Sequence, residues 1–305
     1  MGRGDTPRAT AGSVRTAPGC RTDAAILRKM SDPRRREARS HGITGRGPRR
    51  YGPQGPTLGE LAVQALSSVE RGYDLLAPAF DHTPFRTSDG LLRATRDGLA
   101  PLGPFEDGLD LCCGTGAGLG VTDALCRRSV TGVDISAGML ERARLAAPRA
   151  ALVRADARAL PFAPASFDLA VTFGALGHFL PRDLPALFGQ AHRVLRPGGR
   201  LAFPLPGPPR PGSRAALGLL AFDTAMRIRN AVWRPPFVMY YRVLTFGVLR
   251  DALGGAGFEV RTYAMPEFGR REGGGPRCRL VVATRPPRDG QAPGAVGASP
   301  GRPAL

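Results

Sequence analysis

The stretch that decides the fold runs Leu109-Asp110-Leu111-Cys112-Cys113-Gly114-Thr115-Gly116-Ala117-Gly118 and continues to Val130-Thr131-Gly132-Val133-Asp134. Its residue types predict a short buried strand, a glycine-rich turn, a helix and a second strand that ends in an acid. Gly114 and Gly116 lack a Cβ, so the backbone there can turn sharply and lie against a ligand. The following helix would present free N–H groups at its start, and Asp134 could accept two hydrogen bonds from a ribose diol.

The details of this turn separate two classes of cofactor. A nicotinamide fingerprint, G-x-G-x-x-G, needs a third glycine, but Leu119 and Val121 occupy that position in the two possible frames. Asp110, at the end of the first strand, would repel a pyrophosphate and would suit a ligand that carries positive charge. The plain alternative is a glycine-rich connection between a strand and a helix that binds no ligand.

The stretch resembles motif I of the class I S-adenosylmethionine-dependent methyltransferases, whose pattern is roughly D-x-G-x-G-x-G. Cys112 stands where that pattern has its first glycine. Three further segments, 130–143, 156–173 and 193–203, agree with the family in order and spacing. The resemblance covers residues 70–205 well and 245–285 loosely, and it extends loosely to the methyltransferases of quinone biosynthesis. It implies S-adenosyl-L-methionine as the cofactor, and its sulfonium and ammonium groups carry the positive charge that Asp110 suits.

The alternation of strands and helices predicts an α/β fold with a doubly wound, mostly parallel sheet, and cofactor binding at the carboxyl ends of the strands. The resemblance implies a Rossmann-like sheet of seven strands with an antiparallel last strand, N-terminal helices and a helical lid insertion. We expect a disordered Arg/Gly/Pro-rich tail over 1–56, a methyltransferase domain over 57–287 with its lid at 206–246, and a flexible tail over 288–305.

Three residues predict helix starts by their side-chain chemistry. Thr57 precedes Glu60 by three positions, which is the pattern of a capping box. Ser136 and Thr245 each stand before a helical pattern, and both residue types favour the N-cap position.

The resemblance assigns cofactor contacts to residues that follow the strands. Ile135 would lie against the adenine, Asp156 would accept from its amino group, and the N–H of Ala157 would meet a ring nitrogen. The Tyr73-Asp74 pair fits an N-terminal helix that folds over the methionine end of the cofactor; the alternative is a half-buried tyrosine beside a solvated aspartate. The expected cofactor-binding set is Tyr73, Asp110, Cys112, Gly114, Gly116, Asp134, Ile135, Met139, Asp156, Ala157 and Phe173.

The acceptor end is predicted less specifically. His178, after the fourth predicted strand, is the best placed candidate for a catalytic base, and the alternative is that it only shapes the pocket. Four aromatic residues between a proline-rich linker and the last predicted helix suggest a substrate lid, or else ordinary packing of an added helix: Trp233, Phe237, Tyr240 and Tyr241.

Some subclasses of methyltransferase are disfavoured by what the chain lacks. Enzymes that methylate amino groups of nucleic acids or glutamine carry N/D-P-P-Y/F after the fourth strand, where this chain has Thr172-Phe173-Gly174-Ala175. Cytosine-C5 enzymes need a Pro-Cys nucleophile, and the sequence contains no Pro-Cys. What remains is O-, N- or C-methylation of a small, apolar or aromatic acceptor.

The charge of the chain supports a rival reading. The formal net charge is +18, and residues 1–57 hold 13 basic and four acidic residues. An RNA- or anionic-surface-binding protein that uses this basic tail is the alternative, and a cofactor-binding fold without catalysis is another. However, only Lys29 is a lysine, and the many arginines occur with 30 prolines and 41 glycines, as a GC-rich coding bias produces. Nucleic acid is therefore the less favoured partner.

Compartment and processing are predicted from composition. The five cysteines lack the pair spacing of a zinc site, and an odd number argues against a disulfide framework, so we expect no metal and a cytoplasmic location. No continuous apolar run reaches the length of a membrane-spanning helix. The Arg-rich start is compatible with a transit peptide or a disordered tail. It is also compatible with a start codon placed too far upstream, and Met30 is then one alternative start. The oligomeric state is left open.

Overall fold

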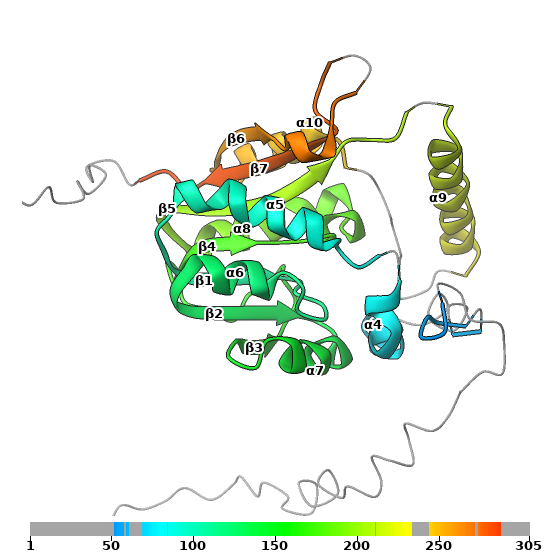
Figure 1. Ribbon diagram of the computed structural model, residues 1–305, viewed down its shortest axis with the longest axis horizontal. Coiled ribbons are helices and arrows are strands. Elements are labelled where there is room, and N and C mark those ends of the chain that lie inside the picture. Colours follow the sequence, from blue (N-terminus) through cyan, green and yellow to red (C-terminus); the bar gives the residue numbers. More distant parts are fainter. Residues whose placement is uncertain are drawn as a thin grey trace, which may run out of the picture. The chain divides into compact units, whose positions relative to one another are not determined.

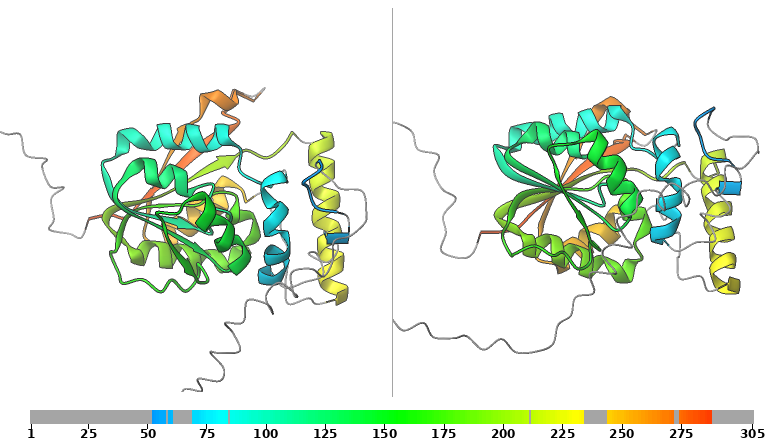
Figure 2. Two further views of the ribbon diagram at one scale, coloured as in Figure 1. Left: turned by 60° about the horizontal axis from the view of Figure 1, so that its bottom comes forward. Right: turned by 90° about the horizontal axis from the view of Figure 1, so that it is seen from below.

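The computed structural model describes residues 52–57, 59–60, 69–83, 85–210, 212–233, 244–271 and 274–287. These residues carry a seven-stranded sheet with helices on both of its faces (Figures 1 and 2). The strands are β1 (Phe105–Leu111), β2 (Cys126–Asp134), β3 (Ala151–Arg154), β4 (Phe167–Val171), β5 (Leu195–Pro206), β6 (Glu259–Ala264) and β7 (Cys278–Thr284).

The strand order confirms the predicted fold class. The strands lie in the order β3-β2-β1-β4-β5-β7-β6, and the first five are parallel to their neighbours. β7 pairs antiparallel with both β5 and β6, so it is inserted between them. Parallel strands bring their carboxyl ends to one edge of the sheet, and β1 lies at the point where the order reverses.

The helices and 3₁₀ turns alternate with the strands along the chain. They are α4 (Val69–Leu76), η1 (Ala77–His82), α5 (Asp89–Leu99), η2 (Ala100–Leu102), α6 (Leu119–Leu125), α7 (Ala137–Ala146), η3 (Ala175–His178), η4 (Pro181–Asp183), α8 (Leu184–Val194), α9 (Arg214–Trp233), α10 (Phe246–Gly255) and η5 (Pro266–Phe268). α8 and α10 cover one face of the sheet, and α5 and α6 cover the other (Figures 1 and 2).

The predicted helix starts are confirmed by their hydrogen bonds. The Ser136 hydroxyl accepts from the Met139 N–H at 3.1 Å and begins α7. Thr245 begins α10, and its hydroxyl accepts from the third residue of that helix. Thr57 and Glu60 form the reciprocal capping box, since the Thr57 N–H donates to the Glu60 carboxylate at 2.7 Å and the Glu60 N–H donates to the Thr57 hydroxyl at 3.2 Å.

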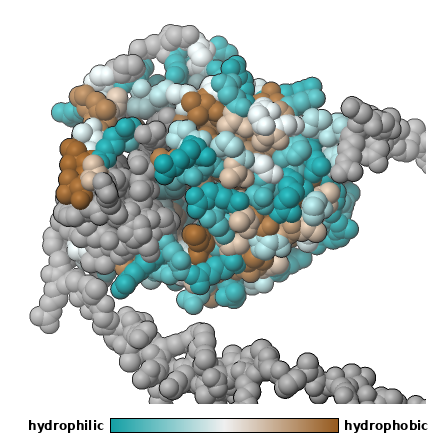
Figure 3. Space-filling view, turned by 180° about the vertical axis from the view of Figure 1, so that it is seen from behind, coloured by the Kyte–Doolittle hydropathy of each residue, from teal (hydrophilic) through white to brown (hydrophobic). Residues whose placement is uncertain are grey.

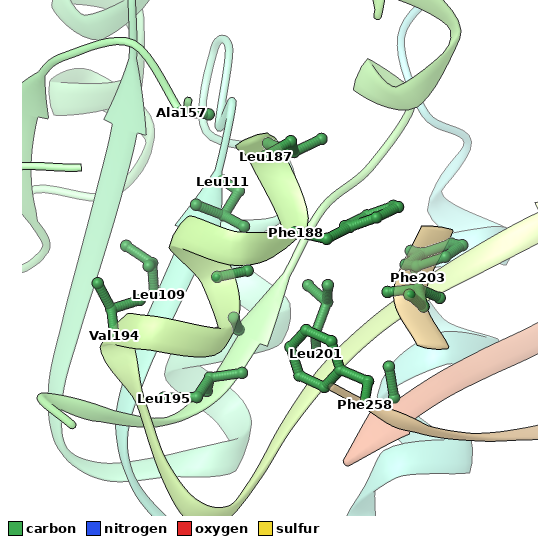
Figure 4. Close-up of a cluster of buried hydrophobic side chains, with 14 of the residues drawn as sticks. Leu109, Leu111, Ala157, Leu187, Phe188, Val194, Leu195, Leu201, Phe203 and Phe258 are labelled. Atoms are coloured by element: carbon green, nitrogen blue, oxygen red, sulfur yellow. The ribbon is translucent and has the colours of Figure 1, made fainter. Parts of the chain in front are cut away.

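The core follows from the alternation of side chains along each strand. In β1, Leu109 and Leu111 face α8 and lie with Leu187 and Val194 in one buried cluster (Figure 4). In the neighbouring strand β4, Ala170 is the residue that pairs with Leu109. The opposite face buries a second cluster that includes Leu99, Leu169, Val171, Ala202 and Leu280. Burial on both faces fixes the register of the sheet and therefore the position of every turn at its carboxyl edge.

A buried acid ties three strands together at the amino-terminal side of β1. Asp107 is 5% exposed; it pairs with Arg128 of β2 and accepts from Ser129 Oγ at 2.6 Å and from Arg196 of β5 at 2.7 Å. The Arg128 hydrogen bond, with those from Ser129 and Arg196, holds the pKa of Asp107 well below its usual range although burial acts in the opposite direction.

The ends of the chain and part of the predicted lid lie outside the described residues. Phe237, Tyr240 and Tyr241 belong to that part, and nothing is described of the Trp233 side chain, although its backbone ends α9. Gly55, Pro56 and Thr57 are buried. The predicted domain boundaries stay a prediction.

The surface of the described part mixes hydrophilic and hydrophobic residues, as the view from behind shows (Figure 3). On α9 several apolar side chains are exposed, among them Leu217, Leu220, Ile228 and Val232. None of the described helices has both the length and the apolar character that crossing a bilayer requires.

Candidate functional site

A cavity of about 530 Å³ opens at the carboxyl edge of the sheet. Its walls come from the turn after β1, from the residues that follow β2, β3 and β4, and from α4 and η1. The lining residues include nearly the whole set expected from the sequence: Tyr73, Asp110, Cys112, Gly114, Asp134, Ile135, Met139, Asp156, Ala157, Phe173 and His178. The sequence thus brings together in one cavity residues that lie up to 105 positions apart, such as Tyr73 and His178.

Gly116 is the member of the expected cofactor-binding set that is not among the residues lining the cavity. Its φ of +94° requires glycine, and a Cβ there would come within 3.1 Å of the Ala143 Cα in α7. Gly116 therefore allows the turn to pack closely on α7, and its expected contact with the cofactor stays a prediction.

Gly118 also packs closely, but against residues of the cavity wall. A Cβ at Gly118 would lie 2.5 Å from Asp110 Oδ2 and 2.5 Å from Phe173 Cδ2, and both of those residues line the cavity. The absence of a side chain at Gly118 therefore lets the turn pack against Asp110 and Phe173.

Cys112 adopts a backbone conformation that favours glycine. Its φ is +57°, in the left-handed region that a side chain disfavours. The thiol lines the cavity, and burial together with the nearby Asp134 and Asp110 carboxylates raises its pKa well above the usual range. The thiol is therefore protonated at neutral pH and unsuited to nucleophilic chemistry.

Asp110 is a buried acid without a partner in the described part of the chain. It is 1% exposed, and both of its carboxylate oxygens are buried without a hydrogen bond. Burial, and secondarily the charge of Asp134, raises its pKa well above the usual range. Such an arrangement is costly in isolation, and it fits a site for a positively charged group.

Asp134 joins the two turns that form the floor of the cavity. Its Oδ2 accepts from the Gly114 N–H and its Oδ1 from the Ser136 N–H, each at 2.9 Å. Burial raises the pKa of Asp134, while these backbone bonds act in the opposite direction. A carboxylate has about four acceptor sites, so Asp134 keeps the capacity for further hydrogen bonds from a ligand.

Asp156 faces the cavity from the end of β3 with a partner that the sequence analysis missed. Arg158 lines the cavity, and it donates to Asp156 Oδ2 at 2.7 Å and more weakly to Asp183 at 3.5 Å. The Arg158 hydrogen bond lowers the pKa of Asp156, so this acid is ionised at neutral pH.

Tyr73 and His178 meet across the cavity. The Tyr73 hydroxyl lies 2.9 Å from His178 Nε2, and the two rings stand edge to face with centroids 5.7 Å apart. Desolvation lowers the pKa of His178 to about 4, so the imidazole is neutral at physiological pH. A neutral ring can accept the phenol proton or donate to the phenol oxygen, according to its tautomer.

Aromatic side chains form part of the cavity wall. Phe80, Phe85, Phe173 and Phe179 line it, and Tyr73 packs edge to face against Phe80 with centroids 6.4 Å apart. His82 is exposed and does not line the cavity. The cavity lining therefore combines acidic residues and glycines with aromatic residues.

Comparison with known proteins relates part of the chain to methyltransferases. Residues 109–199 match the family described as "Methyltransferase domain". The chain is 40% identical over 101 residues to an uncharacterised methyltransferase of Synechocystis, covering 33% of this chain and 47% of that protein. It is 36% identical over 155 residues to a 2-phytyl-1,4-naphtoquinone methyltransferase of Synechococcus elongatus, covering 47% of this chain and 65% of the relative. It is also 37% identical over 134 residues to a trans-aconitate 2-methyltransferase of Azoarcus, covering 42% and 51%.

The chain spans less than two thirds of the length of these curated relatives. Among solved structures, it resembles a putative O-methyltransferase from Nostoc punctiforme with a TM-score of 0.53 and 18% identity, covering 72% of this chain and 62% of that one. At that identity the likeness concerns the fold.

Proposed function

Because residues 109–199 make this chain a member of the class I S-adenosylmethionine-dependent methyltransferases, we propose that it transfers a methyl group from S-adenosyl-L-methionine to a small, largely apolar acceptor. The observation that carries the proposal is Asp110, a buried acid with two unpaired oxygens in the wall of a cavity that the family uses for a cationic cofactor. The acceptor class is proposed from the aromatic residues in the lining of that cavity.

The described residues fit the cofactor in both charge and shape. Asp110 would face its positive charge, and Asp134 would accept from the ribose hydroxyls. Ile135 and Met139, which line the cavity, would supply apolar surface beside the adenine. Asp156 and the backbone of Ala157 would hold the adenine edge, and Cys112, Gly114, Tyr73 and Phe173 complete the proposed contacts.

When bound, the cofactor supplies a methyl group on a sulfonium: an electron pair of the acceptor atom forms a bond to the methyl carbon while the carbon–sulfur bond breaks and its electrons stay on sulfur. The contribution of the protein is positioning and exclusion of water. Tyr73, Phe80 and Phe173 would hold a flat acceptor by contact of ring faces and edges.

His178 is proposed as an orienting residue at the acceptor end. With a pKa of about 4, its imidazole is a weak base at neutral pH, where efficient proton removal favours a pKa near the working pH. An acceptor that must lose a proton would therefore depend on its own acidity. Names among the relatives include both a quinone and an acid methyltransferase, so the acceptor atom is left to experiment.

The segment at 206–246 is proposed as the lid, with Trp233, Phe237, Tyr240 and Tyr241 as acceptor contacts. If so, truncating Tyr240 or Trp233 to alanine should impair acceptor use far more than cofactor affinity. A proportionate loss of both, together with a loss of about 3–5 kcal/mol of stability, would indicate core packing instead.

The proposal is tested by a screen of the purified full chain for S-adenosylhomocysteine formation with quinones, phenols, amines and fatty acids. Asp134→Ala serves as the control variant, because loss of the ribose acceptor should weaken cofactor binding by about 1–3 kcal/mol. Absence of calorimetric binding of S-adenosylhomocysteine to the folded wild-type chain would contradict the proposal.

A further inference from the structure

The segment of α4 and η1 crosses the carboxyl ends of four adjacent strands. Glu70 pairs with Arg154 at the end of β3, and Asp74 reaches the start of α7 after β2. Asp81 accepts from the Thr115 hydroxyl after β1 at 2.6 Å, and Tyr73 meets His178 after β4. One stretch of chain therefore contacts the turn that follows each of the four strands around the cavity.

Asp74 makes the tightest set of these contacts. Its Oδ1 accepts from Ser136 Oγ at 2.6 Å and from the Gly138 N–H at 2.8 Å. The Ser136 hydroxyl in turn accepts from the Met139 N–H, so Asp74 extends the N-terminal cap of α7 from a second helix. A carboxylate at this end of a helix is favoured by its free N–H groups and its dipole. Asp74 is thus engaged by two donors, which corrects the alternative of a solvated aspartate.

Gly138 shows independently that α4 is seated on α7. A Cβ at Gly138 would lie 3.0 Å from the Asp74 Cα and 3.1 Å from the Asp74 carbonyl oxygen. Glycine costs stability inside the first turn of a helix relative to alanine. Its presence at this contact therefore allows an approach of backbone to backbone that any other residue would obstruct.

The position of Asp74 relative to the cavity separates its role from that of its neighbour. Tyr73 lines the cavity, as do Ile135 and Met139 on either side of the cap, whereas Asp74 does not. Asp74 therefore binds Ser136 and Gly138, which are the chain neighbours of the lining residues Ile135 and Met139, without lining the cavity itself.

We propose that Asp74 is a positioning residue, which fastens α4 to the start of α7 and thereby holds Tyr73 in the wall of the cavity. The inference rests on the proposed function, because the donor is taken to bind beside Tyr73. The ion pair of Glu70 with Arg154 is solvent-exposed and contributes little to this attachment. Loss of Asp74 should release α4 from α7 and let bound nucleoside leave faster.

The test measures the affinity and the dissociation rate of S-adenosylhomocysteine by calorimetry and stopped flow. Asp74→Ala should weaken binding about tenfold, mostly through faster dissociation, in keeping with the loss of a helix cap. Asp74→Asn keeps an acceptor oxygen and should recover most of the affinity. Gly138→Ala, which obstructs the same contact from the α7 side, should reproduce the faster dissociation. Asp97→Asn, an exposed acid of α5 paired with Arg96, is the matched control and should change neither quantity.

A second variant separates positioning from plain stability. If Asp74 acts through Tyr73, the effects of Asp74→Ala and Tyr73→Phe on dissociation should be less than additive in the double variant. A lower melting temperature with unchanged dissociation in both Asp74→Ala and Gly138→Ala would overturn the inference while leaving the proposed function intact. If the folded wild-type chain fails to bind S-adenosylhomocysteine, the proposed function and this inference fall together.

Discussion

At the scale of single residues, Asp110 links stability to the site. Its pKa in the folded chain is raised by burial, so its contribution to stability is fully present below the ordinary aspartate pKa and is lost as the pH rises toward the raised value. In the Asp110→Asn variant an amide replaces the carboxyl group, and an amide does not ionise. The variant should therefore be more stable than the wild type without ligand, with a difference that grows by up to about 1.4 kcal/mol per pH unit above pH 4.

The same substitution should weaken binding of S-adenosylmethionine more than binding of S-adenosylhomocysteine, because only the former carries the sulfonium charge. Denaturant unfolding across the pH range and calorimetry with both nucleosides check the two halves of the prediction. Equal stability of variant and wild type at every pH would mean that Asp110 ionises normally.

Cys112 offers a test of backbone strain. Its φ of +57° favours glycine, so Cys112→Gly should stabilise the ligand-free chain by about 1 kcal/mol. Cys113 is the matched control, since it does not share the left-handed φ, and Cys113→Gly should be destabilising. The measurement is the free energy of unfolding of both variants, and a loss of stability in Cys112→Gly would show that contacts of the thiol outweigh the strain.

At the scale of elements, the acid at the start of β1 joins that strand to β2 and β5. Removing the charge with Asp107→Asn should cost about 2 kcal/mol at neutral pH, because charged hydrogen bonds with Arg128 and Arg196 are lost. The pKa of Asp107 is lowered in the folded chain, so its stabilisation is complete above the ordinary aspartate pKa and disappears as the pH falls below it.

Unfolding curves at neutral pH and in acid measure this difference. The difference in the free energy of unfolding between the wild type and Asp107→Asn should become smaller as the pH falls. A difference that is constant with pH would assign the effect to packing of the side chain instead.

The elements were predictable where the signal is local. The capping box of Thr57 and Glu60 and the cap at Ser136 involve residues three apart, and both were predicted from residue type. The central strands were predicted as short apolar runs, because a strand that is buried on both faces carries few polar residues. What the sequence did not reveal are contacts between distant segments, such as Gly118 against Phe173 or Asp74 against Gly138. These depend on how the turns after different strands converge, which no short window of sequence encodes.

At the scale of the whole molecule, the basic N-terminal region distinguishes the proposed function from its rival. Deletion of residues 1–44 should leave cofactor affinity and methyl transfer unchanged, because every described residue that lines the cavity lies beyond position 72. Deletion as far as Glu60 is the contrasting variant and should lower stability, since it removes the buried Gly55, Pro56 and Thr57.

The measurements are calorimetry, S-adenosylhomocysteine formation and their dependence on salt. Loss of activity in the shorter deletion, with steeply salt-sensitive binding of RNA by the intact chain, would favour the rival.

The insertion of β7 between β5 and β6 has a consequence for synthesis. The strand that completes the sheet is the last to leave the ribosome, and until it arrives β6 has no neighbour and β5 exposes a free hydrogen-bonding edge. A nascent chain can assemble the cavity walls around β1 to β4 while that edge is still open to pairing with another polypeptide. Premature stop codons before Cys278 should therefore yield aggregation rather than a shortened enzyme, because the missing strand is interior to the sheet and not at its border.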